Sequence, residues 1–106
     1  MNKKIDSSPF ERDTWKRIQE DSEFASEFFE DLSERPIAVQ FAVFRKLRGL
    51  TQETMASRLH RRQNYVSKLE KPGLDHLVSH YEKAVKFLNG RLAIIPEGAH
   101  LIMRTQ

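Results

Sequence analysis

Three polar side chains near the centre of the chain, Gln63, Asn64 and Lys68, have the chemistry needed to read the edges of DNA bases. Gln and Asn amides each present a donor beside an acceptor, which matches adenine at two positions, and a Lys ammonium can reach the acceptors of guanine. Val66 and Leu69 lie three residues apart in the same stretch and give it an opposite, apolar face. The pattern predicts a helix that begins at Gln63 and points these polar side chains away from the core.

A second group of polar and cationic side chains lies close to these three in the sequence and suits the phosphate backbone or the wall of a groove. The group consists of Gln52, Arg61, Arg62, Tyr65 and Ser67. Contacts to phosphate hold a protein on the duplex, whereas contacts to base edges specify a sequence. The alternative interpretation is an ordinary polar surface helix of a small helical protein, and amphipathicity alone does not separate the two.

Four further helices are predicted around this one. Thr51 can cap a short helix directly before it, whose apolar face carries Met55, Ala56 and Leu59. A capping box predicts a helix from Pro9 to about Glu20, and a second front helix begins at Asp21 or Ser22. A third begins after Pro36 and ends at Gly49. The apolar positions are Trp15 and Ile18 in the first front helix and Phe24, Phe28 and Leu32 in the second. In the helix after Pro36 they are Ile37, Phe41, Phe44 and Leu47.

The C-terminal third is predicted to hold one more helix and a strand. Ser79 to Glu82 form a second capping box, and Asn89 and Gly90 would close the helix that it opens. The run from Leu92 to Ile95 is apolar and β-branched and ends before Pro96, which is typical of a strand. Because one strand cannot stand alone, it must pair with a second subunit or a partner protein, or pack as irregular coil.

The charge distribution divides the chain of 106 residues into unlike parts. Lys and Arg number 6 against 10 Asp and Glu in residues 1–36, 8 against 2 in residues 37–72, and 4 against 3 in the remainder, for a net charge of +3. A basic middle suits phosphate neutralisation, whereas an acidic front suits a different partner. We therefore expect an all-α fold with an acidic helical arm in residues 1–36, a DNA-binding unit in 37–90, and a short strand and tail for dimerisation in 91–106.

Several function classes are disfavoured by composition. The chain has no cysteine, no apolar run long enough to span a membrane and no signal-peptide core at its start, so we expect a cytoplasmic protein without disulfides. No Ser/His/Asp or paired-carboxylate arrangement stands out, so an enzyme is not expected and no catalytic residue is assigned. His76 and His80 are four residues apart but lack a third ligand, so neither a metal site nor any other cofactor is predicted.

The motif from Gly49 to Ala56, G-L-T-Q-x-x-M-A, followed by V-S-K-L-E from Val66 to Glu70, resembles the phage-repressor/Cro-like (XRE) helix-turn-helix family. The resemblance implies a lambda-repressor-like helical bundle that binds an operator in double-stranded DNA as a homodimer. It also implies an ion pair between Arg45 and Glu70. The family usually has glycine in the turn and Ser or Thr before the recognition helix. Here these positions hold His60 and Arg62, so a left-handed non-glycine residue and a weak cap are expected.

A wider resemblance, over residues 20–96, is to HigA-like antitoxins of bacterial toxin-antitoxin pairs. It rests on the order of an acidic helix, the helix before G-L-T-Q, the helix-turn-helix, and a final helix followed by G-R-L-x-I. It implies that the chain also neutralises a basic RelE/HigB-like mRNA-cleaving toxin. The residues suited to that partner are Trp15, Phe24, Glu27, Phe28 and Asp31.

The same residues also fit simpler interpretations. The phenylalanines would then form the chain's own core, and the carboxylates would be only solvated. Two further functions are compatible with the helix-turn-helix pattern: a stand-alone transcriptional regulator without a toxin partner, and a protein-interaction module that uses the same scaffold.

Overall fold

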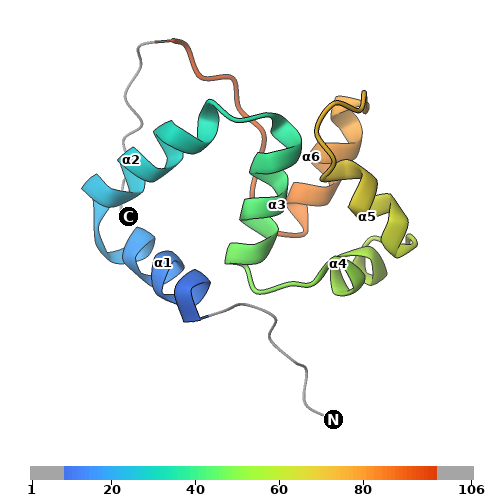
Figure 1. Cartoon of the computed structure of the whole chain (residues 1–106), viewed down its shortest axis with the longest axis horizontal. Helices are drawn as coiled ribbons and strands as arrows, with labels where there is room; N and C mark the ends of the chain where they lie inside the picture. Colours follow the sequence, from blue (N-terminus) through green and yellow to red (C-terminus); the bar gives the residue numbers. More distant parts are fainter. Residues whose placement is uncertain (1–8, 98–106) are drawn as a thin grey trace.

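The structure, a computed structural model, describes residues 9–97, and within that range the chain forms helices and no strand (Figure 1). The helices are α1 (Pro9–Glu20), α2 (Ser22–Ser33), α3 (Ile37–Leu47), α4 (Gln52–Arg58), α5 (Gln63–Leu69) and α6 (Val78–Lys86). The predicted all-α class is therefore confirmed for the described residues. None of these helices is long and apolar enough to cross a membrane.

The first two helices form a hairpin that packs against α3 (Figure 1). Asp21 caps α2, since its carboxylate accepts a hydrogen bond from the backbone N–H of Phe24 at 3.0 Å. A small apolar cluster joins the three helices through Ile18, Ala25 and Leu47. Partly buried side chains pack around it, namely Trp15, Phe24, Phe28, Phe29 and Val43. This cluster fixes the acidic front of the chain on one side of α3.

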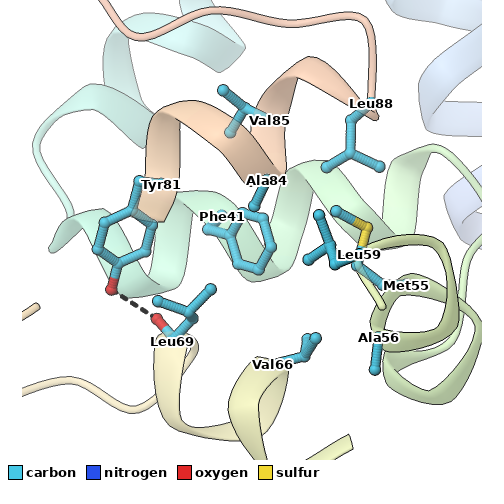
Figure 2. Packing of buried hydrophobic residues seen from close by; sticks show 10 residues of the cluster. All are labelled: Phe41, Met55, Ala56, Leu59, Val66, Leu69, Tyr81, Ala84, Val85 and Leu88. Atoms are coloured by element: carbon cyan, nitrogen blue, oxygen red, sulfur yellow. Dashed lines mark hydrogen bonds between the residues drawn. The ribbon is translucent and has the colours of Figure 1, made fainter. Parts of the chain in front are cut away.

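A larger apolar cluster joins α3 to α4, α5 and α6 (Figure 2). Its buried members are Phe41, Met55, Ala56, Leu59, Val66, Leu69, Tyr81, Ala84, Val85 and Leu88. The Tyr81 hydroxyl donates a hydrogen bond to the Leu69 carbonyl at 2.7 Å, so the polar end of this buried ring is satisfied at the end of α5. Because Leu47 of α3 belongs to the smaller cluster and Phe41 to the larger, α3 is the helix common to both.

Three helices end with a residue in the left-handed conformation: Gly49, His60 and Asn89, with φ of 76°, 57° and 60°. At each end the left-handed residue and its successor donate backbone hydrogen bonds to carbonyls of the last turn. His60 N–H donates to Ser57 and Arg61 N–H donates to Ala56 at 3.1 and 2.9 Å. This Schellman pattern satisfies carbonyls that the helix leaves free and turns the chain sharply. The left-handed conformation predicted for His60 is confirmed.

One expectation for the C-terminal third is corrected, and the predicted strand is not confirmed. The last helix begins at Val78 with Leu77 as its cap and no side-chain capping bond, so the capping box predicted at Ser79 is not the start. The run from Leu92 to Ile95 forms no strand but an irregular segment, because no neighbouring strand among the described residues offers hydrogen bonds. Leu92 instead packs on the larger cluster. The rest of the predicted strand and tail, 98–106, lies outside the described residues.

Candidate nucleic-acid interface

The candidate site is built on α4 and α5, which meet through a tight turn and pack on each other. The Thr51 hydroxyl accepts a hydrogen bond from Thr54 N–H at 2.9 Å and so starts α4 as predicted. Arg62 occupies the N-cap position of α5 without a side-chain capping bond. Its guanidinium has no acceptor, so no first-turn amide of α5 donates to the side chain of the cap residue, and the Tyr65 N–H donates to the Arg62 carbonyl at 3.0 Å instead.

One face of α5 is completely buried and the other is open to solvent. Val66 and Leu69 are 0% and 1% exposed, while Gln63, Asn64 and Lys68 are all exposed. The alternation follows from the 3.6-residue helical repeat, which puts Asn64 and Lys68, four residues apart, on one side and Val66 and Leu69, three residues apart, on another. Asn64 and Lys68 therefore share one outward face, while Gln63 is exposed beside Gln52 at the start of the helix.

Gln52, predicted to hold phosphate, is half-buried and takes part in a hydrogen-bonded chain. Its amide nitrogen donates to Glu70 Oε1 at 2.9 Å, and its amide oxygen accepts from Gln63 Nε2 at 3.4 Å. The first contact has an ordinary length, whereas the second is long for an N–H···O bond and correspondingly weaker. The pairing links the first turns of α4 and α5 through their side chains, and sequence spacing did not predict it.

Arg45 and Glu70, paired by the family resemblance, form a buried ion pair that ties α3 to the end of α5. Their side chains are only 6% and 7% exposed. Arg45 Nη2 donates to Glu70 Oε1 at 3.0 Å and Arg45 Nε donates to Oε2, which is the two-pronged geometry that a guanidinium and a carboxylate favour. Arg45 Nη1 also donates to the Leu50 carbonyl. No described buried side-chain polar atom lacks a partner.

The Glu70 carboxylate also influences Tyr81, whose hydroxyl is bound to the neighbouring Leu69 carbonyl. Burial raises the pKa of the Tyr81 phenol, and the negative charge of Glu70 raises it further. Both effects disfavour a phenolate. The phenol therefore stays protonated and keeps its donor at neutral pH.

The cationic side chains beside the turn gather around an aromatic ring of α5. The Arg61 guanidinium lies 4.7 Å from the centre of the Tyr65 ring, and the His80 ring of α6 lies 5.8 Å from that ring. Tyr65 and Ser67 are half-buried, whereas Arg61 and Arg62 are exposed. A hollow here is lined by His60, Arg61, Arg62, Asn64, Tyr65 and Lys68. With four cationic or amide side chains around an aromatic ring, this hollow suits a phosphate group.

A second hollow lies along the first turns of α4 and α5. It is lined by Glu11, Arg45, Lys46, Thr51, Gln52, Glu53 and Gln63. Lys46 and Glu11 were not predicted as site residues, and no sequence signal could have found Glu11, because α1 reaches this hollow only through tertiary packing. The start of the acidic front thus borders the same surface as Gln52 and Gln63.

The residues predicted to bind a protein partner fall into two groups, aromatic side chains that pack on the core and carboxylates that are exposed. Trp15, Phe24 and Phe28 are half-buried and pack on the smaller cluster, so much of their apolar surface serves the chain's own core. Glu27 and Asp31 are exposed on α2. Asp31 forms an ion pair with Arg35 at 3.7 Å, with side chains 72% and 58% exposed, which is a weakly stabilising surface contact.

His76 and His80 both contact α5. His76 Nε2 lies 2.9 Å from the Lys68 carbonyl, and the His80 ring lies beside Tyr65. In residues 9–97 no group of three or more His, Asp or Glu side chains is placed to hold a metal ion. Comparison of the chain with protein-family models, with curated proteins and with solved structures gave no match in any of the three.

Proposed function

We propose that this protein is a sequence-specific DNA-binding repressor of the helix-turn-helix type, in which α5 enters the major groove. The observation that carries the proposal is the division of α5: Val66 and Leu69 are fully buried, while Asn64 and Lys68 share an exposed face and Gln63 is exposed at the first residue of the helix. Amide and ammonium groups on an accessible helix face match the donor and acceptor pattern of base edges. The basic middle of the chain, 8 Lys and Arg against 2 acids, supplies the charge for phosphate binding.

In this proposal two copies act together on a near-palindromic operator in the cytoplasm. Each would place α5 in one of two successive major grooves roughly 34 Å apart. Gln63, Asn64 and Lys68 would contact bases. The residues that would hold phosphate or the groove wall are Gln52, Arg61, Arg62, Tyr65 and Ser67. The strand predicted at Leu92 to Ile95, which is irregular in the single chain, would require pairing with a second copy to form.

The experiment that tests this function is selection from a library of random DNA duplexes, followed by binding measurements over a range of salt concentrations. Arg62→Ala should weaken all sequences alike and lower the slope of log K against log salt by about 1, whereas Asn64→Ala should relax sequence preference. Arg35→Ala removes the same charge from the arm and should change neither property. A wild-type chain that enriches no sequence and binds with no salt dependence would refute the proposal and favour a protein-interaction module.

The resemblance to HigA-like antitoxins adds a second part to the proposal, the neutralisation of a basic RelE/HigB-like mRNA-cleaving toxin. The observation that favours this part is the composition of α2, which has four carboxylates and no Lys or Arg, with Glu27 and Asp31 exposed. Carboxylates on an open face can cover a cationic surface by charge complementarity. The partly buried aromatic side chains Trp15, Phe24 and Phe28 would contribute only their outer edges.

The toxin-binding part is tested with the protein encoded beside this chain. Co-purification should succeed with the wild type and fail with the double variant Glu27→Lys/Asp31→Lys, while selection of DNA by that variant stays the same. A neighbouring protein that is not basic, or that binds both forms equally, would leave the chain as a stand-alone transcriptional regulator.

A further inference from the structure

We infer that His60 is a further phosphate-binding residue of the interface, and that its imidazole takes up a proton when DNA binds. Affinity for DNA should then rise as the pH falls. The inference rests on the proposed function and deepens it, because it adds one residue and a form of regulation to the hollow beside the turn between α4 and α5. It concerns a position where this chain departs from the resembled family, which usually has glycine in the turn.

The backbone holds His60 at the edge of this hollow. Its N–H donates to the Ser57 carbonyl at 3.1 Å, and the N–H of Arg61 donates to the Ala56 carbonyl at 2.9 Å, which fixes the turn at the residue and just after it. The His60 side chain is exposed and lines the same hollow as the Tyr65 ring. The imidazole is therefore attached at a fixed point beside the place where a phosphate group would bind.

The conformation of His60 is unfavourable for a residue with a side chain. At φ 57° the Cβ crowds the following carbonyl oxygen, which glycine avoids. His60 belongs to neither apolar cluster, so its side chain does not offset this strain by packing in the core. Strained backbone positions of this kind concentrate at active sites and ligand-binding sites. Because the imidazole is exposed in the hollow, a contact with a bound ligand is what it can supply.

The hollow collects positive charge and, among the described side chains that line it, has no carboxylate. The charged or titratable groups around it are Arg61 and Arg62 of the turn, Tyr65 and Lys68 of α5, and His80 of α6, whose ring lies 5.8 Å from that of Tyr65. An anion attracted by these cations brings negative charge next to His60. A nearby negative charge favours the protonated form of an imidazole. A phosphate group in the hollow should therefore favour proton uptake by His60.

Proton uptake strengthens the phosphate contact in return. A neutral imidazole has one N–H donor, whereas the imidazolium ion has two and carries a positive charge. Hydrogen bonds from a charged donor to phosphate are stronger than those from a neutral donor. Because linkage is reciprocal, a proton that improves DNA binding by a given factor is itself bound more tightly by that factor once DNA is present. Free histidine side chains titrate at about pH 6.5, so affinity should change most between about pH 6 and 8.

The inference is tested by measuring Kd at about pH 6 and pH 8 with the duplex enriched by selection and with a shuffled duplex of the same composition. His60→Asn is the main variant, because Asn stays neutral and tolerates the left-handed conformation. The ratio of Kd at the higher pH to Kd at the lower pH should be about three- to tenfold larger for the wild type than for His60→Asn, the value of roughly one hydrogen bond. Both duplexes should show it, because a phosphate contact carries no sequence information.

The salt dependence gives a second measurement. At the lower pH the slope of log K against log salt should be steeper for the wild type by about 0.9 for each bound subunit, and His60→Asn should have the same slope at both pH values. His60→Lys has a permanent charge and should bind at the higher pH nearly as tightly as the wild type does at the lower one. His76→Gln is the matched control, since His76 does not line the hollow, and it should keep the wild-type pH dependence.

The possible failures can be told apart. Circular dichroism at both pH values verifies that each variant folds, and His60→Asn decides the question if His60→Lys does not. The inference is overturned if folded His60→Asn keeps the wild-type dependence on pH and salt. An effect confined to the enriched duplex would make His60 a base-reading residue and overturn the phosphate contact. If the wild type enriches no sequence and binds neither duplex with a salt dependence, the proposed function itself fails, and the inference with it.

Discussion

The Arg45–Glu70 pair has consequences for stability that depend on its burial. Both side chains are almost fully enclosed, and their polar atoms bind each other, the Leu50 carbonyl and Gln52. Burying such a pair costs desolvation free energy. Removing one member costs more stability, because the other charge stays buried without a partner. The pair thus makes the contact between α3 and the end of α5 specific.

Glu70→Ala should lower the free energy of unfolding by about 3–5 kcal/mol, because it leaves the Arg45 guanidinium buried without a counter-charge. Urea denaturation followed by circular dichroism measures this change. Asp31→Ala is the matched control, since it breaks the exposed pair with Arg35 and should cost less than about 1 kcal/mol. An unchanged unfolding midpoint for Glu70→Ala would reject the structural importance of the pair.

Tyr81 should make stability fall at alkaline pH. Burial and the Glu70 charge raise its pKa above the ordinary 10.0, so its contribution is fully present below pH 10.0 and is lost as the pH rises through the raised value. Tyr81→Phe lacks the bond to Leu69 and should be about 1 kcal/mol less stable near neutral pH. The difference should vanish or reverse at high pH. Urea denaturation of both forms across this range gives the measurement, and Tyr65→Phe serves as the control; a constant difference at every pH would contradict the assignment.

At the level of elements, the turns between helices depend on backbone conformation as much as on side chains. Gly49 suits its left-handed position because it has no Cβ, and Asn89 tolerates such a position better than most residues. His60 has neither advantage at φ 57°. The turn between α4 and α5 therefore holds local strain that the packing of Met55, Leu59 and Val66 must offset.

His60→Gly should stabilise the protein by about 0.5–1 kcal/mol, because it relieves the left-handed strain by more than it adds to the entropy of the unfolded chain. Thermal unfolding compares the variant with the wild type. Ser57→Gly, at an exposed position inside α4, is the control and should destabilise by about 0.5–1 kcal/mol. A loss of stability in His60→Gly would show that the His60 side chain contributes more than its backbone conformation costs.

For the whole molecule, the important feature is that α3 belongs to both apolar clusters. Leu47 packs with the front helices, while Phe41 packs with α4, α5 and α6. Neither cluster keeps its full packing surface if α3 unfolds. The acidic front and the candidate nucleic-acid interface are consequently coupled in stability, although their charges suit different partners.

The described part of the chain should therefore unfold in one transition. Trp15 is the chain's single tryptophan and lies in the smaller cluster, so its fluorescence reports on the front helices, while circular dichroism reports on all helices. Leu69→Ala, in the larger cluster, should cost about 2–5 kcal/mol and shift both signals equally. A fluorescence midpoint that stays in place while the circular dichroism midpoint moves would show two independent units.

The sequence by itself determined the features that depend on neighbours a few residues apart. The first five helices begin close to their predicted positions, Asp21 and Thr51 cap as expected, and His60 is left-handed, because periodicity and capping are local effects. The separation of Asn64 and Lys68 from Val66 and Leu69 also follows from the helical repeat.

Only the tertiary structure decided which distant groups meet. The contacts of Gln52 with Glu70 and Gln63 and the presence of Glu11 beside α4 join segments far apart in the sequence, which no local pattern encodes. The start of α6 at Val78 puts Ser79 inside its first turn, where no side-chain capping bond forms. The run from Leu92 to Ile95 is irregular because a strand depends on a partner strand, which no local pattern supplies.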